Sequence, residues 1–133
     1  MSTRSLDDLK PAVRPLVDAF LSSCIDAGID VLVTCTLRTG AEQTALYAQG
    51  RTAPGHIVTR AKAGQSAHNY GLAIDVVPMV NGKPDWSGAD PVWQTMGKLG
   101  QAAGLTWLGA HGSSFPEDPH FELPDWRSVA GLA

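Results

Sequence analysis

The sequence has little charge, few cysteines and no long apolar run, and each shortage excludes a class of protein. Charged residues make up 17% of the 133 residues and hydrophobic residues 44%, a balance that favours a packed core over a disordered chain. The net charge is −3, so nucleic acid is not expected as a partner, because binding phosphates requires a concentrated basic face. No apolar run approaches the roughly 20 residues of a membrane span, and the N-terminus lacks the basic-then-apolar order of a secretory signal. The length predicts a single domain, residues 1–133.

The two cysteines are too few for a disulfide scaffold or for a Cys-type zinc site. Cys24 falls in a helical pattern and Cys35 in a strand pattern. We expect both to be buried thiols that pack as small apolar side chains. Whether the two ever form a pair is left open by the sequence.

The spacing of apolar residues predicts several helices and strands. Helical spacing or capping residues predict helices over 9–25, 39–49 and 90–104. Alternating or β-branched runs predict strands over 30–36, 72–77, 105–108 and 120–123, and residues 51–67 are expected to form a long loop. This order predicts an α+β fold, in which a small and mostly antiparallel sheet carries helices packed on one side.

Asp75 is the only polar residue in the predicted strand 72–77. Burying an unpaired carboxylate costs several kcal/mol, so this side chain needs a cation, a set of donors or a metal as its partner. His68 precedes it by seven residues, an odd spacing that would put the two side chains on opposite faces of an unbroken strand. Gly71 lies between them and supplies the bend that would bring His68 to the side of Asp75.

A third group of polar side chains precedes and occupies the last predicted strand. Alternation puts His120 and Glu122 on one face, and the flanking prolines hold Glu117 and Asp118 in a turn above it. Two neutral imidazoles and one carboxylate suit Zn²⁺ and leave its fourth position for water, whose pKa the metal lowers to near neutrality. A carboxylate that is not a ligand can then take the proton of the water and pass it to the leaving amine. We assign this role to Glu117, with Asp118 as the competing candidate.

These residues together resemble a known family. Ser66-x-His68, Gly71-x-Ala73-x-Asp75 and Glu117-x-x-His120 are similar to the motifs of the zinc peptidases that cleave peptidoglycan stem peptides. That family includes the D-alanyl-D-alanine carboxypeptidases and dipeptidases and the phage L-alanyl-D-glutamate endopeptidases. The resemblance extends over roughly residues 30–123. The small size and the stretch Gln49-Gly50-Arg51-Thr52 most resemble the phage branch, the endolysins that lyse a host cell at the end of infection.

The resemblance implies a role for each matching residue. It makes His68, Asp75 and His120 the ligands of Zn²⁺ and Glu117 the general base, although members of the phage branch often carry Asp at the position of Glu117. It also makes Arg38 the cation near the substrate, where it would hold a carboxylate or polarise the scissile carbonyl. The local pattern agrees, because Arg38 follows a predicted strand and its planar fork can hold a carboxylate with two bonds. The alternative is a surface arginine in a weak salt bridge.

The sequence therefore predicts a zinc metallopeptidase that hydrolyses the L-alanyl-D-glutamate bond of the peptidoglycan stem peptide, as a bacteriophage endolysin does in host lysis. A D-alanyl-D-alanine carboxypeptidase with the same site is one alternative, and a non-catalytic zinc-containing binding module is another. We expect a monomer, and the length predicts no separate cell-wall-binding domain. The resemblance also implies that the protein stays in the host cytoplasm until a holin releases it to the cell wall or periplasm.

Overall fold

The computed structural model describes residues 2–109 and 118–132, which fold around a five-stranded sheet. The strands are β1 (Asp30–Cys35), β2 (Ala73–Val80), β3 (Lys83–Pro84), β4 (Thr106–Trp107) and β5 (His120–Glu122). Their order in space is β1-β2-β5-β4, and β3 forms a short hairpin with the end of β2. All the strand pairs in this sheet are antiparallel, which confirms the predicted α+β class.

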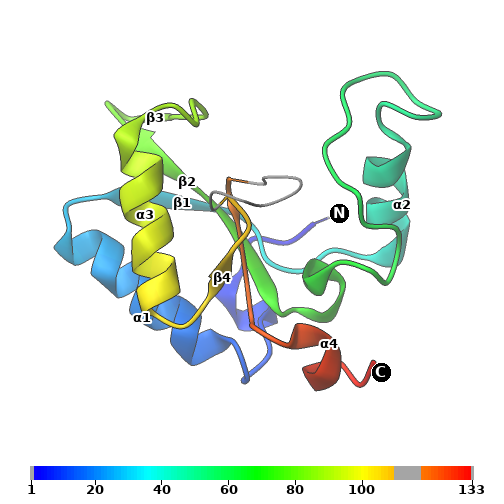
Figure 1. The fold of residues 1–133 in the computed structure, drawn as a ribbon, viewed down its shortest axis with the longest axis horizontal. Helices are drawn as coiled ribbons and strands as arrows, with labels where there is room; N and C mark the ends of the chain where they lie inside the picture. The colour runs from blue at the N-terminus through cyan, green and yellow to red at the C-terminus, as the bar shows by residue number, and fades with distance from the viewer. Residues whose placement is uncertain (1, 110–117, 133) are drawn as a thin grey trace.

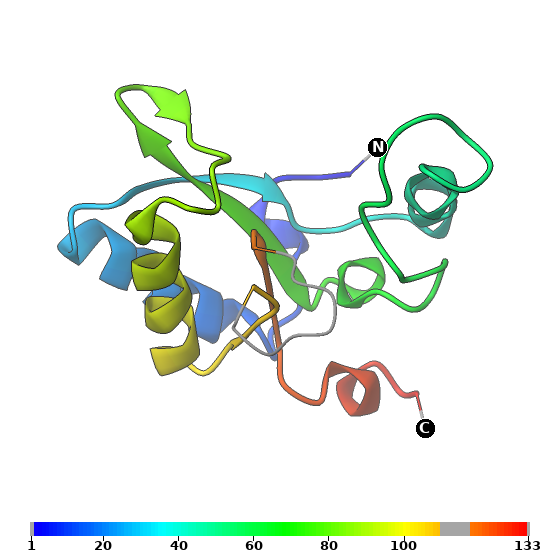
Figure 2. The same cartoon turned by 45° about the horizontal axis from the view of Figure 1, so that its top comes forward.

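Within the described residues, four α-helices and two 3₁₀ helices accompany the sheet. They are η1 (Leu6–Asp8), α1 (Arg14–Asp26), α2 (Gly40–Ala48), η2 (Ala67–Tyr70), α3 (Pro91–Ala102) and α4 (Trp126–Val129). Helices α1 and α3 contact each other and cover one face of the sheet, whereas α2 and α4 stand at the other end of the molecule (Figures 1 and 2). The helical layer on one side of the sheet therefore consists of α1 and α3. Within the described residues, no helix is long and apolar enough to cross a bilayer.

The structure departs from the predicted elements at three places. Residues 9–13 form turns, and α1 begins only at Arg14, because Pro15 fits the first turn of a helix but not its interior. The strand predicted over 72–77 extends to Val80 and enters a hairpin in which Asn81 and Gly82 both adopt positive φ angles, as in a type I′ turn. The single-turn helix α4 was not predicted at all.

Helix α3 packs closely on the strands that carry the C-terminal part of the site. A Cβ atom at Gly97 would collide with the Trp107 ring, and one at Gly100 would collide with the Phe121 ring. The Trp107 and Phe121 rings are stacked with their centroids 6.1 Å apart, and Phe20 of α1 meets Phe121 at 4.6 Å. This packing fixes β5, and with it His120, which is the neighbour of Phe121 in the chain.

Candidate active site

Three neighbouring strands bring polar side chains into one row across the sheet. The register pairs Asp75 of β2 with Cys35 of β1 on one side and with His120 of β5 on the other. Residues directly opposite each other on antiparallel strands point to the same face. Cys35, Asp75 and His120 therefore lie side by side, although they are far apart in the sequence.

The fourth side chain, His68, comes from η2, immediately before β2. The Ser66 hydroxyl accepts a hydrogen bond from the His68 backbone N–H at 3.2 Å and caps this helix. Gly71 ends it with a φ of 68°, and a Cβ atom at this residue would lie 2.8 Å from the Asp8 carbonyl oxygen. The Arg38 backbone N–H donates to the His68 carbonyl at 3.0 Å, which ties η2 to the segment after β1. The bend expected at Gly71 is present, and it turns His68 toward Asp75.

Both imidazole rings use one nitrogen toward Asp75 and the other toward an acceptor. His68 Nε2 lies 2.9 Å and His120 Nδ1 lies 3.3 Å from the same Asp75 oxygen, Oδ1. The remaining nitrogen of His68, Nδ1, lies 3.1 Å from the Thr36 carbonyl oxygen. The remaining nitrogen of His120, Nε2, lies 2.7 Å from Glu122 Oε1. These outer acceptors fix which nitrogen of each ring faces the shared point.

The three ionisable side chains His68, Asp75 and His120 shift one another's pKa values. Burial alone would raise the pKa of Asp75, but the imidazoles of His68 and His120 overcome it and hold that pKa well below its usual range. Burial likewise opposes charge on His68 and His120, yet the Asp75 carboxylate raises the pKa of both rings. The cluster is therefore built to hold a positive charge between the three side chains.

The donor set fits a divalent metal such as Zn²⁺. Two imidazole nitrogens approach one carboxylate oxygen, Asp75 Oδ1, and these are the ligand types of catalytic zinc sites. In such sites each histidine ligand donates its other N–H to a carboxylate or a backbone carbonyl. Glu122 and the Thr36 carbonyl supply these two acceptors.

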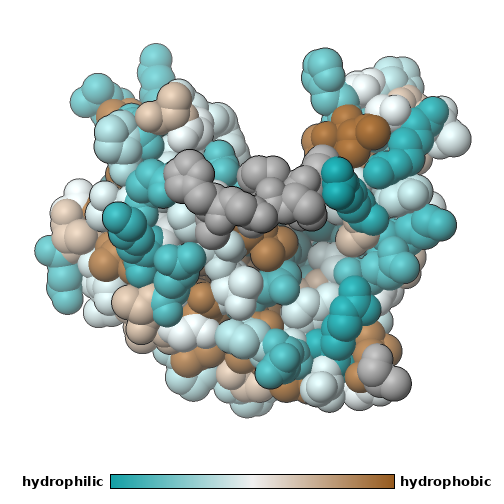
Figure 3. Space-filling model, in the orientation of Figure 1, coloured by the Kyte–Doolittle hydropathy of each residue, from teal (hydrophilic) through white to brown (hydrophobic). Residues whose placement is uncertain are grey.

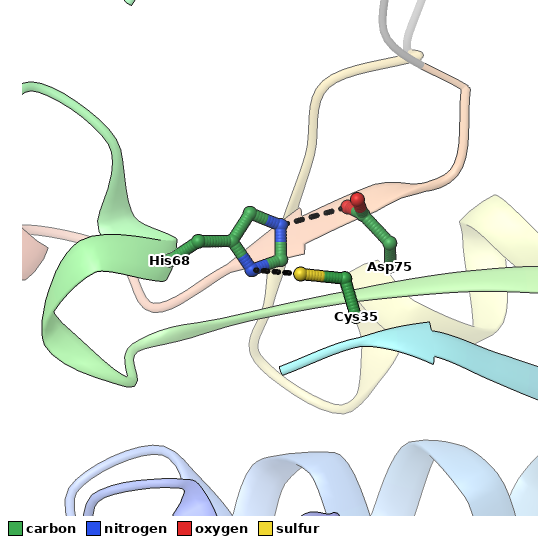
Figure 4. A group of neighbouring side chains, drawn as sticks. All are labelled: Cys35, His68 and Asp75. Atoms are coloured by element: carbon green, nitrogen blue, oxygen red, sulfur yellow. Dashed lines mark hydrogen bonds and ion pairs between the residues drawn. The ribbon is translucent and has the colours of Figure 1, made fainter. Parts of the chain in front are cut away.

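Cys35 also belongs to this cluster, which the sequence did not reveal. Cys35, His68 and Asp75 offer three possible ligand atoms within 4.8 Å of one another. Figure 4 shows that the thiol approaches His68 at Nδ1, 3.6 Å away, whereas Asp75 approaches at Nε2. Burial would raise the pKa of the Cys35 thiol, but His68 and Arg38 lower it. Both cysteines are buried and free, as expected for Cys24 and Cys35.

Arg38 lies beside Asp75 and is largely buried, with 12% of its side chain exposed. Its Nη1 donates to the Gln43 side chain at 3.0 Å, and its Nη2 lies 3.5 Å from Cys35 Sγ and 3.6 Å from Asp75 Oδ2. The buried Gln43 side chain in turn donates to the Ala61 carbonyl at 2.7 Å. Protein groups thus occupy both Nη atoms, and the guanidinium is a fixed positive charge at the edge of the cluster.

The cluster opens into a cleft of about 830 Å³. Arg38, Asp75, His120 and Glu122 line its floor. The surrounding walls include residues of α2 and the loop after it, of the β3–α3 connection, of the segment before β5 and of α4: Leu46, Ile57, Val58, Trp86, Asp118, Trp126 and Arg127. Figure 3 shows this face hollowed between the α2 side and the α3 side. A peptide chain therefore has access to the polar cluster.

The structure describes only one of the two candidates for the general base. Glu117 lies outside the described residues, so its role stays a prediction. Asp118 lines the cleft, and its backbone carbonyl accepts a hydrogen bond from the Trp107 indole at 2.7 Å. Its carboxylate packs against Gly88 and Gly109, and within the described residues it makes no hydrogen bond to the imidazoles.

Comparison with known proteins gives relatives in sequence and a set of similar folds. A family described as D-alanyl-D-alanine carboxypeptidase matches residues 59–123. The peptidoglycan L-alanyl-D-glutamate endopeptidase CwlK of Bacillus subtilis is 37% identical in an alignment 131 positions long, and the match covers 87% of this chain and 74% of that protein.

Two solved structures illustrate the shared fold. The L-Ala D-Glu endopeptidase ChiX of Serratia marcescens has a TM-score of 0.68 at 20% identity, over 98% of this chain and 92% of its own. The vancomycin-resistance D,D-pentapeptidase VanY, solved as a variant in complex with Zn(II), has a TM-score of 0.62 at 14% identity, over 94% of this chain and 80% of its own.

Proposed function

This chain belongs to the M15 family of peptidases, and from that membership we propose that it is a zinc-dependent endopeptidase acting on the L-alanyl-D-glutamate bond of peptidoglycan stem peptides. The relationship to CwlK supports the choice of substrate and bond. The site supports the chemistry, since its donor set is that of a hydrolytic zinc centre.

One observation carries the proposal. His68 and His120 each direct one ring nitrogen to Asp75 Oδ1, and each has its other nitrogen bound by an acceptor, at the floor of an open cleft. We assign these three side chains as the metal ligands. Bound there, Zn²⁺ would polarise the scissile carbonyl as a Lewis acid and lower the pKa of the attacking water.

Other residues of the site would orient the metal ligands and stabilise the negative charge that develops during the reaction. Glu122 and the Thr36 carbonyl hold the imidazoles in the tautomer that presents a lone pair to the metal. Arg38, whose Nη2 lies 3.6 Å from Asp75 Oδ2, would place a positive charge next to the position where the scissile carbonyl gains negative charge.

A carboxylate would move the proton from water to the leaving amine, and we keep Glu117 as that base with Asp118 as the alternative. Glu117→Gln is expected to bind one zinc per chain and to lose hydrolysis, whereas Asp118→Asn is expected to keep most of its activity. The opposite result would transfer the role to Asp118.

Digestion of purified peptidoglycan, followed by mass spectrometry of the fragments, tests the proposed bond. The expected products are a glycan-linked L-alanine and a peptide with a new N-terminal D-glutamate. The family match to D-alanyl-D-alanine carboxypeptidase supports the second candidate, for which release of D-alanine alone would be the signature. Zinc bound without any cleavage would instead favour a binding module.

The biological setting that the sequence suggests is lysis of a bacterial host by a phage-type endolysin released through a holin. Expression of the chain in a bacterium tests it. The culture should lyse when a holin is co-expressed and should grow normally when it is not. Lysis without the holin, or survival with it, would contradict this setting.

A further inference from the structure

We propose that Arg127 binds the free carboxylate of the substrate's D-glutamate and thereby selects stem peptides in which this carboxylate is not amidated. The inference deepens the proposed function and rests on it. The observation behind it is an exposed arginine, stacked on an aromatic ring, in the wall of the cleft that contains the catalytic cluster.

The position of Arg127 follows from the short helix that comes after β5. Trp126 is buried in this helix, packs against the Tyr70 ring with 5.6 Å between ring centroids, and lines the cleft. The guanidinium carbon of Arg127 lies 4.8 Å from the centroid of the Trp126 ring. A cation stacked on a ring loses part of its rotational freedom, so the planar fork is partly oriented before a ligand arrives.

The cleft has one other arginine among its described lining residues, and that one is already engaged. Arg38 is largely buried and gives both Nη atoms to protein groups, and its Nε, which has no hydrogen-bond partner among the described residues, is itself buried. Arg127 is exposed, and within residues 2–109 and 118–132 no carboxylate forms an ion pair with it. Arg127 is therefore the cleft cation that is available to a substrate.

The charges around it favour such a cation for an acidic substrate. Of the described carboxylates that line the cleft, Asp75 would be neutralised by the metal and Glu122 is bound to His120, whereas that of Asp118 forms no ion pair within the described residues. D-Glutamate has two carboxyl groups, and whichever of them continues the peptide, the other remains free within a few bonds of the scissile amide. A carboxylate that enters this cleft is repelled by the Asp118 carboxylate unless a cation pairs with it.

Arginine suits the task better than a point charge, because its fork makes two parallel hydrogen bonds to one carboxylate. Replacing the carboxylate with a carboxamide removes the charge and exchanges one acceptor oxygen for an N–H₂ donor. A charge-assisted hydrogen bond accounts for about 10-fold to 100-fold in equilibrium or rate constants. Because the contact is made by substrate and transition state alike, the effect is expected mainly in KM.

The test compares two synthetic stem peptides that differ only in the free carboxylate or carboxamide of the D-glutamate. The wild-type zinc enzyme is expected to have a kcat/KM about 10-fold to 100-fold higher for the carboxylate peptide. Arg127→Met should lose this preference by becoming slower on the carboxylate peptide while remaining unchanged on the carboxamide peptide. Arg127→Lys should keep part of the preference, because it retains the charge but not the fork.

Arg51 provides a matched control. Its guanidinium also stacks on an aromatic ring, 3.8 Å from the centroid of Tyr47, but it does not line the cleft. Arg51→Met should discriminate between the two peptides as the wild type does.

Three results would overturn the inference: equal rates of the wild type on both peptides, an equal loss on both peptides in Arg127→Met, or the same loss of preference in Arg51→Met. If Arg127→Met fails to fold, as judged by circular dichroism, then full wild-type preference or none in a folded Arg127→Lys would also overturn it. Failure of the wild type to cleave either peptide would instead refute the proposed function, and the assignment of Arg127 with it.

Discussion

Replacing Glu122 with alanine should weaken zinc binding without unfolding the protein. The Glu122 carboxylate accepts a hydrogen bond at 2.7 Å from His120 Nε2, the ring nitrogen that does not face Asp75. Glu122 would therefore act on the metal only through His120. Loss of this acceptor frees the His120 ring to rotate and to change tautomer. It also removes a negative charge that makes the ring a stronger ligand.

The size of the effect follows from the burial of this pair. Only 7% of the His120 side chain and 18% of the Glu122 side chain are exposed, so water can replace the lost acceptor only in part. A hydrogen bond to a charged group contributes about 1.5–3 kcal/mol. That range agrees with the 10-fold to 100-fold losses of metal affinity, about 1.4–2.8 kcal/mol, seen when such outer acceptors are removed.

Competition with a chromophoric chelator at fixed pH measures the zinc dissociation constant. Glu122→Ala should raise it by about 10-fold to 100-fold, and Glu122→Gln should raise it less, because the amide oxygen still accepts from His120. Asp26→Asn, an exposed site at the end of α1, removes the same charge far from the cleft and should leave the constant unchanged. An unchanged affinity in a folded Glu122→Ala would refute the role given to this hydrogen bond.

Three further predictions concern packing, pH and metal. Gly97→Ala should lower the free energy of unfolding by about 1–3 kcal/mol, because its Cβ atom would collide with the Trp107 ring. Gly40→Ala is the control, because a Cβ atom at Gly40 has room and should not destabilise the protein. Equal denaturation midpoints for the two variants would contradict this prediction. Burial raises the pKa of the Cys24 thiol to about 11, so the unfolded chain ionises first as pH rises. Urea titrations should show the wild type losing about 2 kcal/mol more stability than Cys24→Ala between pH 9 and 11, and parallel curves would exclude this ionisation. Dialysis against a chelator should abolish hydrolysis and one equivalent of Zn²⁺ should restore it, while full activity after the removal of all metal would show that the reaction needs none.

The sequence predicted those parts of the site that depend on local pattern. Alternation in β5 placed His120 and Glu122 on one face, and their hydrogen bond is found there. The odd spacing between His68 and Asp75 required a bend, which Gly71 supplies. Capping residues predicted the helix over 39–49, and Thr39 and Glu42 form a capping box at the start of α2.

The remaining features depend on tertiary contacts that no local pattern encodes. Cys35 lies beside His68 because β1 pairs with β2 in a register that includes a bulge between Val33 and Cys35, and neither strand reveals that register alone. Arg127 lies on a helix of four residues, too short to produce a periodic signal, and reaches the cleft only because the chain turns after β5. Alternation placed Glu122 on the correct face, but its hydrogen bond with His120 Nε2 depends on the orientation of the His120 ring, which the sequence does not reveal.

The metal assignment is tested most directly by a crystal structure of the zinc-loaded protein with diffraction data collected on both sides of the zinc absorption edge. We predict one anomalous peak within about 2.0–2.2 Å of His68 Nε2, an Asp75 carboxylate oxygen and His120 Nδ1. A peak bound to the Cys35 sulfur, or a zinc ion that leaves any of these three side chains uncoordinated, would contradict the account.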